Sequence, residues 1–402
     1  MTGVAGKRGL PALDAALAQL SQAQLRRERR TVSICAAPGE RLLTLADGRT
    51  LLDFSSNDYL GLARHPALAQ AMASSAALHG AGSGASHLIT GHGAEHAALE
   101  EELADFTGRE RALLFGSGYT ANLAVMSVLA GRGERVLLDR LSHASLIDGA
   151  RLAQAKLARY AHADAAEAER LAATAPTRIA LIGTDGVFSM DGDLAPLPQL
   201  ARTARAHEAW LVVDDAHGLG VTGASGRGTL EHFGLNTTDV PVLVGTLGKA
   251  FGSCGAFVAG DAALIEYLMQ TARSYIYTTA LPQPMAAASR AALALARREG
   301  WRRERLTEHI ARFRALAAAA DLPLMDSATP IQPLRLPSSA SALSAQRALE
   351  AAGLCVVAIR PPTVPAGGAR LRIALAATHT EAQIETLVAE LARACAAARS
   401  AG

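Results

Sequence analysis

The sequence has few aromatic residues and few charged ones. Phe, Trp and Tyr make up 4% of its 402 residues, and Asp, Glu, Lys and Arg make up 19%. Scarce aromatic side chains disfavour a surface on which single-stranded nucleic acid stacks. The 39 basic residues nearly balance the 37 acidic ones, which leaves a formal net charge of +2. This balance argues against nucleic acid as a partner.

Cysteine is also scarce, and long apolar runs are absent. The four cysteines form no C-x-x-C pair, so the sequence predicts neither a disulfide framework nor a metal site; they are Cys35, Cys254, Cys355 and Cys395. No stretch approaches the roughly 20 continuous apolar residues of a membrane helix. The N-terminus lacks the charged start and apolar run of a signal peptide. We therefore expect a cytoplasmic protein with reduced thiols and no membrane partner.

Half of the residues are apolar, and their pattern predicts an α/β fold. Between about residues 50 and 290, short apolar runs alternate with helix-length stretches rich in Ala and Leu. The predicted strands are Ala112–Phe115, Val136–Asp139, Ile179–Thr184, Trp210–Asp214, Val242–Thr246 and Ala256–Ala259. Such alternation is typical of a mostly parallel sheet covered by helices on both faces.

The two ends of the chain differ from this middle part. Leucines at three- and four-residue steps predict an N-terminal helix; they are Leu10, Leu13, Leu17 and Leu20. After about residue 285 the pattern predicts one long Ala/Arg helix to residue 320, then short strands and a closing helix. The strands lie near Ile331–Leu336, Cys355–Ile359 and Leu371–Leu375, and the helix starts at Glu381. We expect an N-terminal helix and arm (1–45), a large α/β domain (46–290) and a smaller α+β domain (291–402).

Residues whose side chains or backbone could bind a ligand or take part in catalysis lie at the ends of four of the predicted strands. Open parallel sheets bind their ligands at the carboxyl ends of their strands. Asp214 and His217 follow one strand, and a carboxylate and an imidazole there would project into one crevice. An acid in this position is also a common helix cap. Lys249 lies between glycines after another strand, where desolvation would lower its pKa and free the amine to attack a carbonyl. A surface lysine in a flexible loop is the alternative.

Two further strand ends complete the set. Gly118 and Tyr119 lie in a glycine-rich turn that opens a helix, where backbone N–H groups can hold a phosphate. A plain tight turn explains the same residues. His143 follows another strand, and a solitary histidine is more often structural. Together the four ends supply a phosphate cradle, a flat aromatic side chain, a carboxylate, an imidazole donor and a shielded lysine, all of which pyridoxal phosphate (PLP) needs.

These residues resemble the α-oxoamine synthase family of fold-type I PLP enzymes. The resemblance runs from about residue 40 to the C-terminus. Its most specific stretches are Phe54–Leu62, Ser142–Leu146, Gly186–Asp193, Asp214–Gly218 and Thr246–Gly252. The family implies a large sheet domain with a smaller C-terminal domain, and a homodimer whose active sites take residues from both subunits.

The resemblance also implies a role for each matched residue. Lys249 would hold the cofactor as a Schiff base and then transfer protons. Asp214 would pair with the pyridine nitrogen and His217 with the ring hydroxyl oxygen, while His143 would stack on the ring. The remaining cofactor contacts implied are those of Ser189, with the ring oxygen or imine, and of Gly118, Tyr119 and Thr246, around the phosphate.

The segment Arg360–Pro365 points to one branch of the family. It resembles the enzymes that condense L-alanine with a pimeloyl thioester, carried by CoA or a carrier protein, to make 8-amino-7-oxononanoate for biotin biosynthesis. Arg360 would bind the alanine carboxylate bidentately. The other residues expected at the substrates are Asn57, His143 and Thr363, with Arg26 at the acyl chain. The register within Arg26–Arg30 is open.

Two alternatives remain at this point. Glycine C-acetyltransferase, or another α-oxoamine synthase, would share the cofactor site and differ in substrates. A non-catalytic PLP-fold subunit or regulator belongs to another class. Such proteins commonly lose the lysine, whereas Lys249 and its surroundings are intact here.

Overall fold

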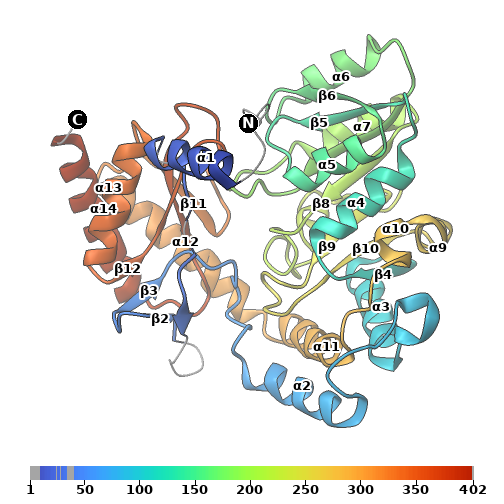
Figure 1. The fold of residues 1–402 in the computed structure, drawn as a ribbon, viewed down its shortest axis with the longest axis horizontal. Helices are drawn as coiled ribbons and strands as arrows, with labels where there is room; N and C mark the ends of the chain where they lie inside the picture. Colours follow the sequence, from blue (N-terminus) through green and yellow to red (C-terminus); the bar gives the residue numbers. More distant parts are fainter. Residues whose placement is uncertain (1–9, 24, 28, 34–39, 401–402) are drawn as a thin grey trace.

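The structure is a computed structural model and describes residues 10–23, 25–27, 29–33 and 40–400. Figure 1 shows two masses that lie side by side. The larger is built on a seven-stranded sheet, and the smaller combines elements from both ends of the chain. Cys35 lies outside the described residues.

The large sheet has the strand order β4-β10-β9-β8-β7-β5-β6. Its strands are β4 (Arg111–Phe115), β5 (Arg135–Asp139), β6 (Lys156–Tyr160), β7 (Ile179–Asp185), β8 (Trp210–Asp214), β9 (Val242–Thr246) and β10 (Ala256–Gly260). All neighbours are parallel except around β10, which is antiparallel to β4 and to β9. The mostly parallel sheet is confirmed. The edge strand β6 was missed, because its charged side chains hide the apolar run.

Helices cover both faces of this sheet, which explains the continuous apolar character of its strands. Val212 packs into the core on one face, and its neighbours Leu211 and Val213 pack into the core on the other. The helices of the first face are α4 (Gly118–Leu129), α5 (Ala144–Leu152), α9 (Ala262–Thr271) and α10 (Arg273–Ile276). Those of the second are α3 (Ala94–Thr107), α6 (Ala165–Ala173), α7 (Leu197–Ala206) and α11 (Gln283–Arg298).

The smaller mass joins the two ends of the chain. A four-stranded sheet, β1-β2-β3-β12, pairs β3 in parallel with β12, and a three-stranded sheet has the order β11-β14-β13. The strands are β1 (Val32–Ser33), β2 (Leu42–Leu45), β3 (Thr50–Asp53), β11 (Ile331–Arg335), β12 (Leu354–Cys355), β13 (Val357–Ile359) and β14 (Arg370–Ala374). The remaining helices are α1 (Leu10–Gln22), α2 (Pro66–His79), η1 (His87–Gly91), α8 (Thr229–His232), α12 (Trp301–Ala319), α13 (Ser339–Ala351) and α14 (Glu381–Ser400).

One helix prediction is wrong and another is confirmed with a difference. The single helix expected at about 285–320 is two helices, α11 and α12, because the chain leaves helical geometry at Glu299, just before Gly300, a residue of low helix propensity. The N-terminal helix α1 is present, but its leucine face stays open, with Leu10 76% exposed. One cluster of buried apolar residues includes side chains from Phe54 to Cys395 and therefore crosses residue 290. The domain division at residues 45 and 290 stays a prediction.

Other expectations from composition can be compared with the described residues. The cysteines there, Cys254, Cys355 and Cys395, are in no disulfide bond. In this part of the chain no helix has the length and apolar character needed to cross a membrane.

The direction of the strands fixes where the chemistry can occur. Because β10 opposes both of its neighbours, β4 points the same way as β5, β7, β8 and β9. These strands therefore bring their carboxyl ends to one edge of the sheet. The segments that carry the predicted cofactor residues all start at that edge.

The turn after Lys249 should tolerate no side chain at Gly252. Gly252 has φ +63°, and an added Cβ would lie 2.2 Å from the backbone nitrogen of Ala63. Gly48, with φ +86° and nothing within 4 Å, is the matched control. We expect Gly48→Ala to lower the free energy of unfolding by about 1–2 kcal/mol, the cost of the left-handed backbone. Gly252→Ala should cost about 1–3 kcal/mol more through the clash. If denaturant unfolding showed the same loss of unfolding free energy for Gly48→Ala and Gly252→Ala, the close contact with Ala63 would not matter for stability.

Candidate active site

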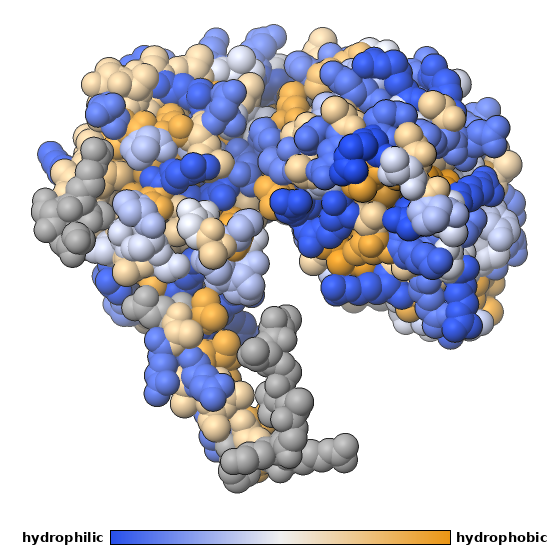
Figure 2. All heavy atoms as spheres, turned by 90° about the horizontal axis from the view of Figure 1, so that it is seen from above, coloured by the Kyte–Doolittle hydropathy of each residue, from blue (hydrophilic) through white to orange (hydrophobic). Residues whose placement is uncertain are grey.

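A cavity of about 910 Å³ lies between the sheet edge and the C-terminal part of the chain. Seen from above, the molecule is hollowed between its two masses (Figure 2). The sheet edge contributes His143, Ser189, His217 and Lys249 to the cavity wall. The other wall includes Asn57, Thr363 and Arg372. Six of the predicted site residues thus line one cavity.

Lys249 follows β9 at the base of this cavity, inside a turn that its own carbonyl closes by accepting the Gly252 N–H at 2.9 Å. Burial lowers the pKa of its amine to about 8, although the carboxylates of Asp214 and Asp185 oppose the shift. Desolvation outweighs the nearby negative charge, since a buried ammonium loses its hydration. Near neutral pH a sizeable fraction of the amine is therefore uncharged and nucleophilic.

A directed chain of hydrogen bonds connects Asp214 with His143. The Asn122 amide donates to Asp214 Oδ2 at 2.6 Å and to Ser145 Oγ at 2.9 Å. Since Ser145 Oγ already accepts from Asn122, its hydroxyl is free to donate to Nδ1 of His143, 2.7 Å away. The Ser145 backbone N–H also points at this nitrogen, at 3.4 Å. The chain sets the positions of the carboxylate and of the imidazole together.

These contacts also fix the tautomer of His143. Because Nδ1 accepts hydrogen bonds, the ring proton belongs on Nε2. Burial lowers the pKa of His143, with Lys249 adding to the shift and Asp214 opposing it, so the ring is neutral at pH 7. Its backbone N–H donates to Asp185 Oδ2 at 2.9 Å. His143 thus offers a flat neutral ring with one N–H available to a bound molecule.

His217, also at the sheet edge, belongs to a second network of hydrogen bonds. Its Nδ1 lies 2.7 Å from the hydroxyl of Tyr59, which in turn lies 3.1 Å from Asn57 Oδ1. Arg372 donates to Asn57 Oδ1 at 3.0 Å and to the Ser189 carbonyl at 2.6 Å. Burial, with Lys249 and Arg372 nearby, holds the pKa of His217 well below its usual range. A neutral His217 is thus held beside a buried guanidinium.

The acid pair after β8 is divided between two tasks. Asp214 faces Asn122, whereas Asp215 turns away from it and accepts the Thr229 N–H at 2.7 Å. Burial raises the pKa of Asp215 to about 7. An added Cβ at Gly218 would lie 2.1 Å from Asp215 Oδ1, so the glycine after His217 makes room for this carboxyl. Asp215 shapes the turn, and Asp214 is the acid available to a ligand.

The predicted phosphate residues lie around the start of α4. Ser117 caps this helix by accepting the Thr120 N–H, so Gly118 and Tyr119 occupy its first turn. The Tyr119 hydroxyl donates to Asp148, and its ring lies edge-on to His143 at 6.4 Å. Thr246 ends β9, and its hydroxyl donates to the Gly255 carbonyl at 3.1 Å. A helix N-terminus with exposed backbone N–H groups at the sheet edge suits a phosphate.

The predicted substrate residues divide into two groups. Asn57 and Thr363 line the cavity, but Arg360 and Arg26 are not among its lining residues. Arg360 instead donates to the Arg26 carbonyl at 3.3 Å, and Arg26 is exposed. The neighbouring Arg27 donates to Thr363 Oγ1 at 2.9 Å. Neither Arg26 nor Arg27 lines the cavity, but Arg27 contacts Thr363, which does.

Sequence reasoning missed three residues that organise the site. Asn122 lies four residues after Gly118, and Arg372 lies in the predicted strand Leu371–Leu375, yet neither was predicted to have a role. Asp185 directly follows the predicted strand Ile179–Thr184, and its position at a strand end was a usable signal. Asn122 gave no such signal, because a polar residue inside a helix is usually solvated, whereas this one is fully buried.

The side chains around the cavity fit PLP without rearrangement of the fold. The cofactor requires an amine for its aldehyde, a carboxylate for its ring nitrogen and donors for its phosphate. Lys249 supplies a desolvated amine, Asp214 is held by Asn122 at the same edge, and the first turn of α4 supplies N–H groups. The neutral ring of His143 adds a flat surface for stacking.

The lowered pKa of Lys249 should be visible when the apoprotein captures the cofactor. Capture requires the neutral amine, so its rate should rise with pH to a midpoint of about 8 rather than 10.5. Borohydride reduction followed by peptide mapping assigns the label, because the sequence has three lysines, Lys7, Lys156 and Lys249. The exposed Lys156 is the control, and Lys156→Ala should capture normally. A midpoint near 10, or label at Lys156, would contradict the assignment.

Comparisons with known proteins agree with this site. Residues 49–391 match the family described as aminotransferase class I and II. An 8-amino-7-oxononanoate synthase of Methylococcus capsulatus is 57% identical over 377 residues, which cover 94% of this chain and 96% of that protein. The structure of a Sphingomonas wittichii serine palmitoyltransferase has TM-score 0.89 at 30% identity and covers 97% of this chain and 98% of that one. An 8-amino-7-oxononanoate synthase of Francisella tularensis has TM-score 0.75 at 34% identity, with coverages of 85% and 97%.

These matches confirm the family resemblance and the cofactor expected from the sequence. They extend over both masses of the molecule, since the family match alone runs from β3 to α14. This chain belongs to the α-oxoamine synthases, PLP-dependent acyltransferases of fold type I, beside the proteins named 8-amino-7-oxononanoate synthase.

Proposed function

We propose that the chain condenses L-alanine with a pimeloyl thioester, on CoA or on a carrier protein, and forms 8-amino-7-oxononanoate with release of CO₂ and the free thiol. The observation that carries the proposal is the single cavity, which holds Lys249, His143 and His217 against Arg372. The relatives that match nearly the whole chain are named for this product.

Bound PLP supplies an electron sink for the bond that breaks at the α-carbon of alanine. Within that chemistry Lys249 acts as base: its neutral amine accepts the α-proton and later returns a proton to the same carbon. The pKa of about 8 suits both directions of transfer near neutral pH. Asp214, held by Asn122, would supply the carboxylate for the ring nitrogen.

Arg372 is the group we propose for the carboxylate of alanine. It is 7% exposed, lines the cavity and lies close enough to Lys249 to lower the pKa of its amine. A guanidinium presents two parallel N–H groups to a carboxylate. Arg360, the sequence-based candidate, bonds to the chain near the first helix and has no wall position. Held at its carboxylate, alanine would present the α-proton toward Lys249.

The thioester would enter along the opposite rim. Arg140 and Arg159 line the outer cavity, both exposed, and Arg159 donates to the Arg140 carbonyl. Leu141 and Ile147 line it beside them and provide apolar surface for an alkyl chain. Two cations at the rim suit the phosphates of a CoA or carrier-protein arm. His143 lines the cavity, and its Nε2–H would hydrogen-bond the acyl carbonyl oxygen while the carbon–carbon bond forms and the carbon–sulfur bond breaks.

We further propose that the protein acts as a homodimer in the cytoplasm. The leucine face of α1 is open, with Leu13, Leu17 and Leu20 at least 42% exposed, and a second subunit would bury such a surface. The free thiols at Cys254 and Cys355 suit a reducing compartment.

Arginine variants test the carboxylate site. Loss of a bidentate ion pair costs about 1.5–3 kcal/mol, so Arg372→Ala should raise the KM for alanine by roughly 10- to 100-fold. The matched change Arg360→Ala should alter that KM only a few-fold, because its guanidinium lies outside the cavity wall. Steady-state assays at saturating thioester measure both values. The reverse order of effects would return the carboxylate role to Arg360.

A product assay tests the reaction itself. Alanine with pimeloyl-CoA should yield 8-amino-7-oxononanoate and one equivalent of CO₂, detected by mass spectrometry. Glycine with acetyl-CoA should react at least about 100-fold more slowly, a difference of about 2.7 kcal/mol in the barrier. Lys249→Ala is the inactive control. Faster turnover of the glycine and acetyl pair would make the chain a glycine C-acetyltransferase, and no turnover of either pair would overturn the proposed enzyme.

A further inference from the structure

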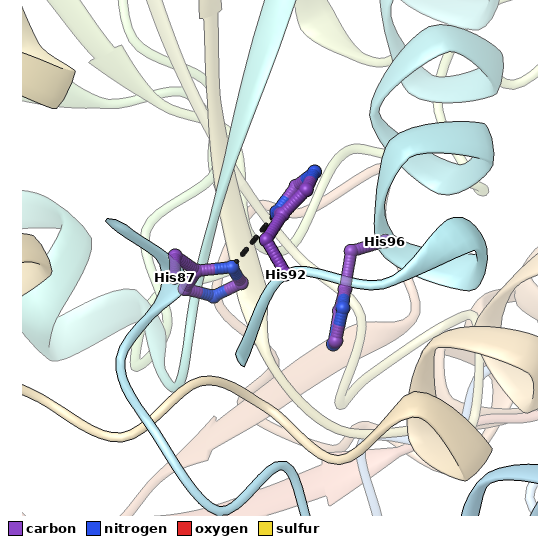
Figure 3. A group of neighbouring side chains, drawn as sticks. All are labelled: His87, His92 and His96. Atoms are coloured by element: carbon purple, nitrogen blue, oxygen red, sulfur yellow. Dashed lines mark hydrogen bonds between the residues drawn. The ribbon is translucent and has the colours of Figure 1, made fainter. Parts of the chain in front are cut away.

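Three histidines lie together at a second place, outside the cavity wall (Figure 3). His87 begins η1, His92 directly follows it, and His96 lies in the first turn of α3. One ring nitrogen from each lies within 4.8 Å of the others. A segment of ten residues thus presents three imidazoles to one point, and the reaction proposed above uses none of them.

All three rings are held in the neutral form, which is the form that binds metal ions. Burial lowers the pKa of His87 to about 3, and His92 and His96 add to that shift. Burial likewise lowers the pKa values of His92 and of His96. Near neutral pH each ring therefore keeps one unprotonated nitrogen.

Contacts on the far sides of two rings indicate which nitrogen that is. Nδ1 of His96 accepts the Gly93 N–H at 3.0 Å, so its proton belongs on Nε2, which donates to the Leu281 carbonyl. Nε2 of His92 lies 3.9 Å from Glu100 Oε2. Histidines that bind metals usually donate their outer N–H to a carbonyl or carboxylate, as His96 does to the Leu281 carbonyl. The inner nitrogens would then be the Nδ1 atoms.

Nδ1 of His87 and Nδ1 of His92 face each other at 3.0 Å. If His92 keeps its proton on Nε2 toward Glu100, a proton on His87 must occupy this gap, and the cluster is then an internally satisfied hydrogen-bond group. A cation can replace that proton when His87 shifts to its other tautomer. His96 would exchange the Gly93 N–H for the cation at the same time.

We propose that His87, His92 and His96 form a binding site for one divalent transition-metal ion of the zinc class, with a fourth position open to solvent. Imidazole nitrogens favour Zn²⁺, Co²⁺, Ni²⁺ and Cu²⁺ over Mg²⁺ or Ca²⁺. The side chain of His92 is 32% exposed and gives the ion a path of entry. His87 is stacked on Tyr275 at 5.0 Å, so a bound ion would fasten η1 and α3 to the segments around Tyr275 and Leu281.

The test uses PLP-loaded enzyme freed of metal with a chelator. Equilibrium dialysis against Zn²⁺ should show about one ion per chain, and Co²⁺ should develop the visible bands of nitrogen coordination. His92→Gln removes the most accessible ligand with little change in packing, and it should abolish both signals while the PLP absorbance band persists. The control His232→Gln changes an exposed histidine beside Phe233 and should bind as the parent does.

Glu100→Gln adds a graded test of the outer contact. It keeps the shape of the side chain and replaces the carboxyl, whose pKa burial raises to about 7, by an amide. Loss of such an outer partner typically weakens metal binding by about 10- to 100-fold. The proposal would be overturned if His92→Gln still bound about one Zn²⁺ ion per chain. It would also be overturned if the parent enzyme bound Zn²⁺ no more tightly than His92→Gln does. A rise in Tm with Zn²⁺ for the parent and for His232→Gln, absent in His92→Gln, would support it.

Discussion

The active site depends on one costly arrangement, a lysine amine placed out of water beside carboxylates. Burial by itself favours the neutral amine, while Asp214 and Asp185 favour the ammonium, and the balance sets the pKa of Lys249 at about 8. A fully hydrated lysine would stay protonated and would neither attack an aldehyde nor accept a carbon-bound proton. The surrounding structure can be understood as the means of holding this amine dry and uncharged without unfolding the sheet edge.

Parallel strands make that arrangement possible. They bring Asp214, Lys249 and the turn before His143 to one edge, where backbone hydrogen bonding has ended and side chains are free to converge. Asn122 then links two segments at this edge, since its single amide group donates hydrogen bonds to both Asp214 and Ser145. The opposite wall comes from both ends of the chain, because β3, which precedes Asn57, pairs with β12, and Arg372 lies on β14. Arg372, the proposed carboxylate site, and Lys249 thereby belong to different parts of the fold.

Much of this could be predicted from the sequence, and the parts that could not have physical reasons. Buried parallel strands appear as short apolar runs, so β8 and β9 were found with their true ends, and so were Asp214 and Lys249 after them. Arg360 and Arg372 look equivalent in the sequence; their different surroundings depend on how the chain folds back from β13 to β14. Contacts such as that of Asn122 with Asp214 join residues far apart in the chain and leave no periodic trace. The histidine cluster also lacks a motif, since its spacing becomes meaningful only once η1 turns into α3.

The most direct measurement is the titration of Lys249 itself. Since the chain has three lysines, isotope-labelled lysine gives an NMR spectrum of the apoprotein simple enough to follow each amine with pH. The account predicts one resonance with a midpoint of about 8, absent in Lys249→Ala. If the Lys249 resonance instead has the reference lysine midpoint of about 10.4, Lys249 is hydrated, and the mechanism built on its neutral amine is contradicted.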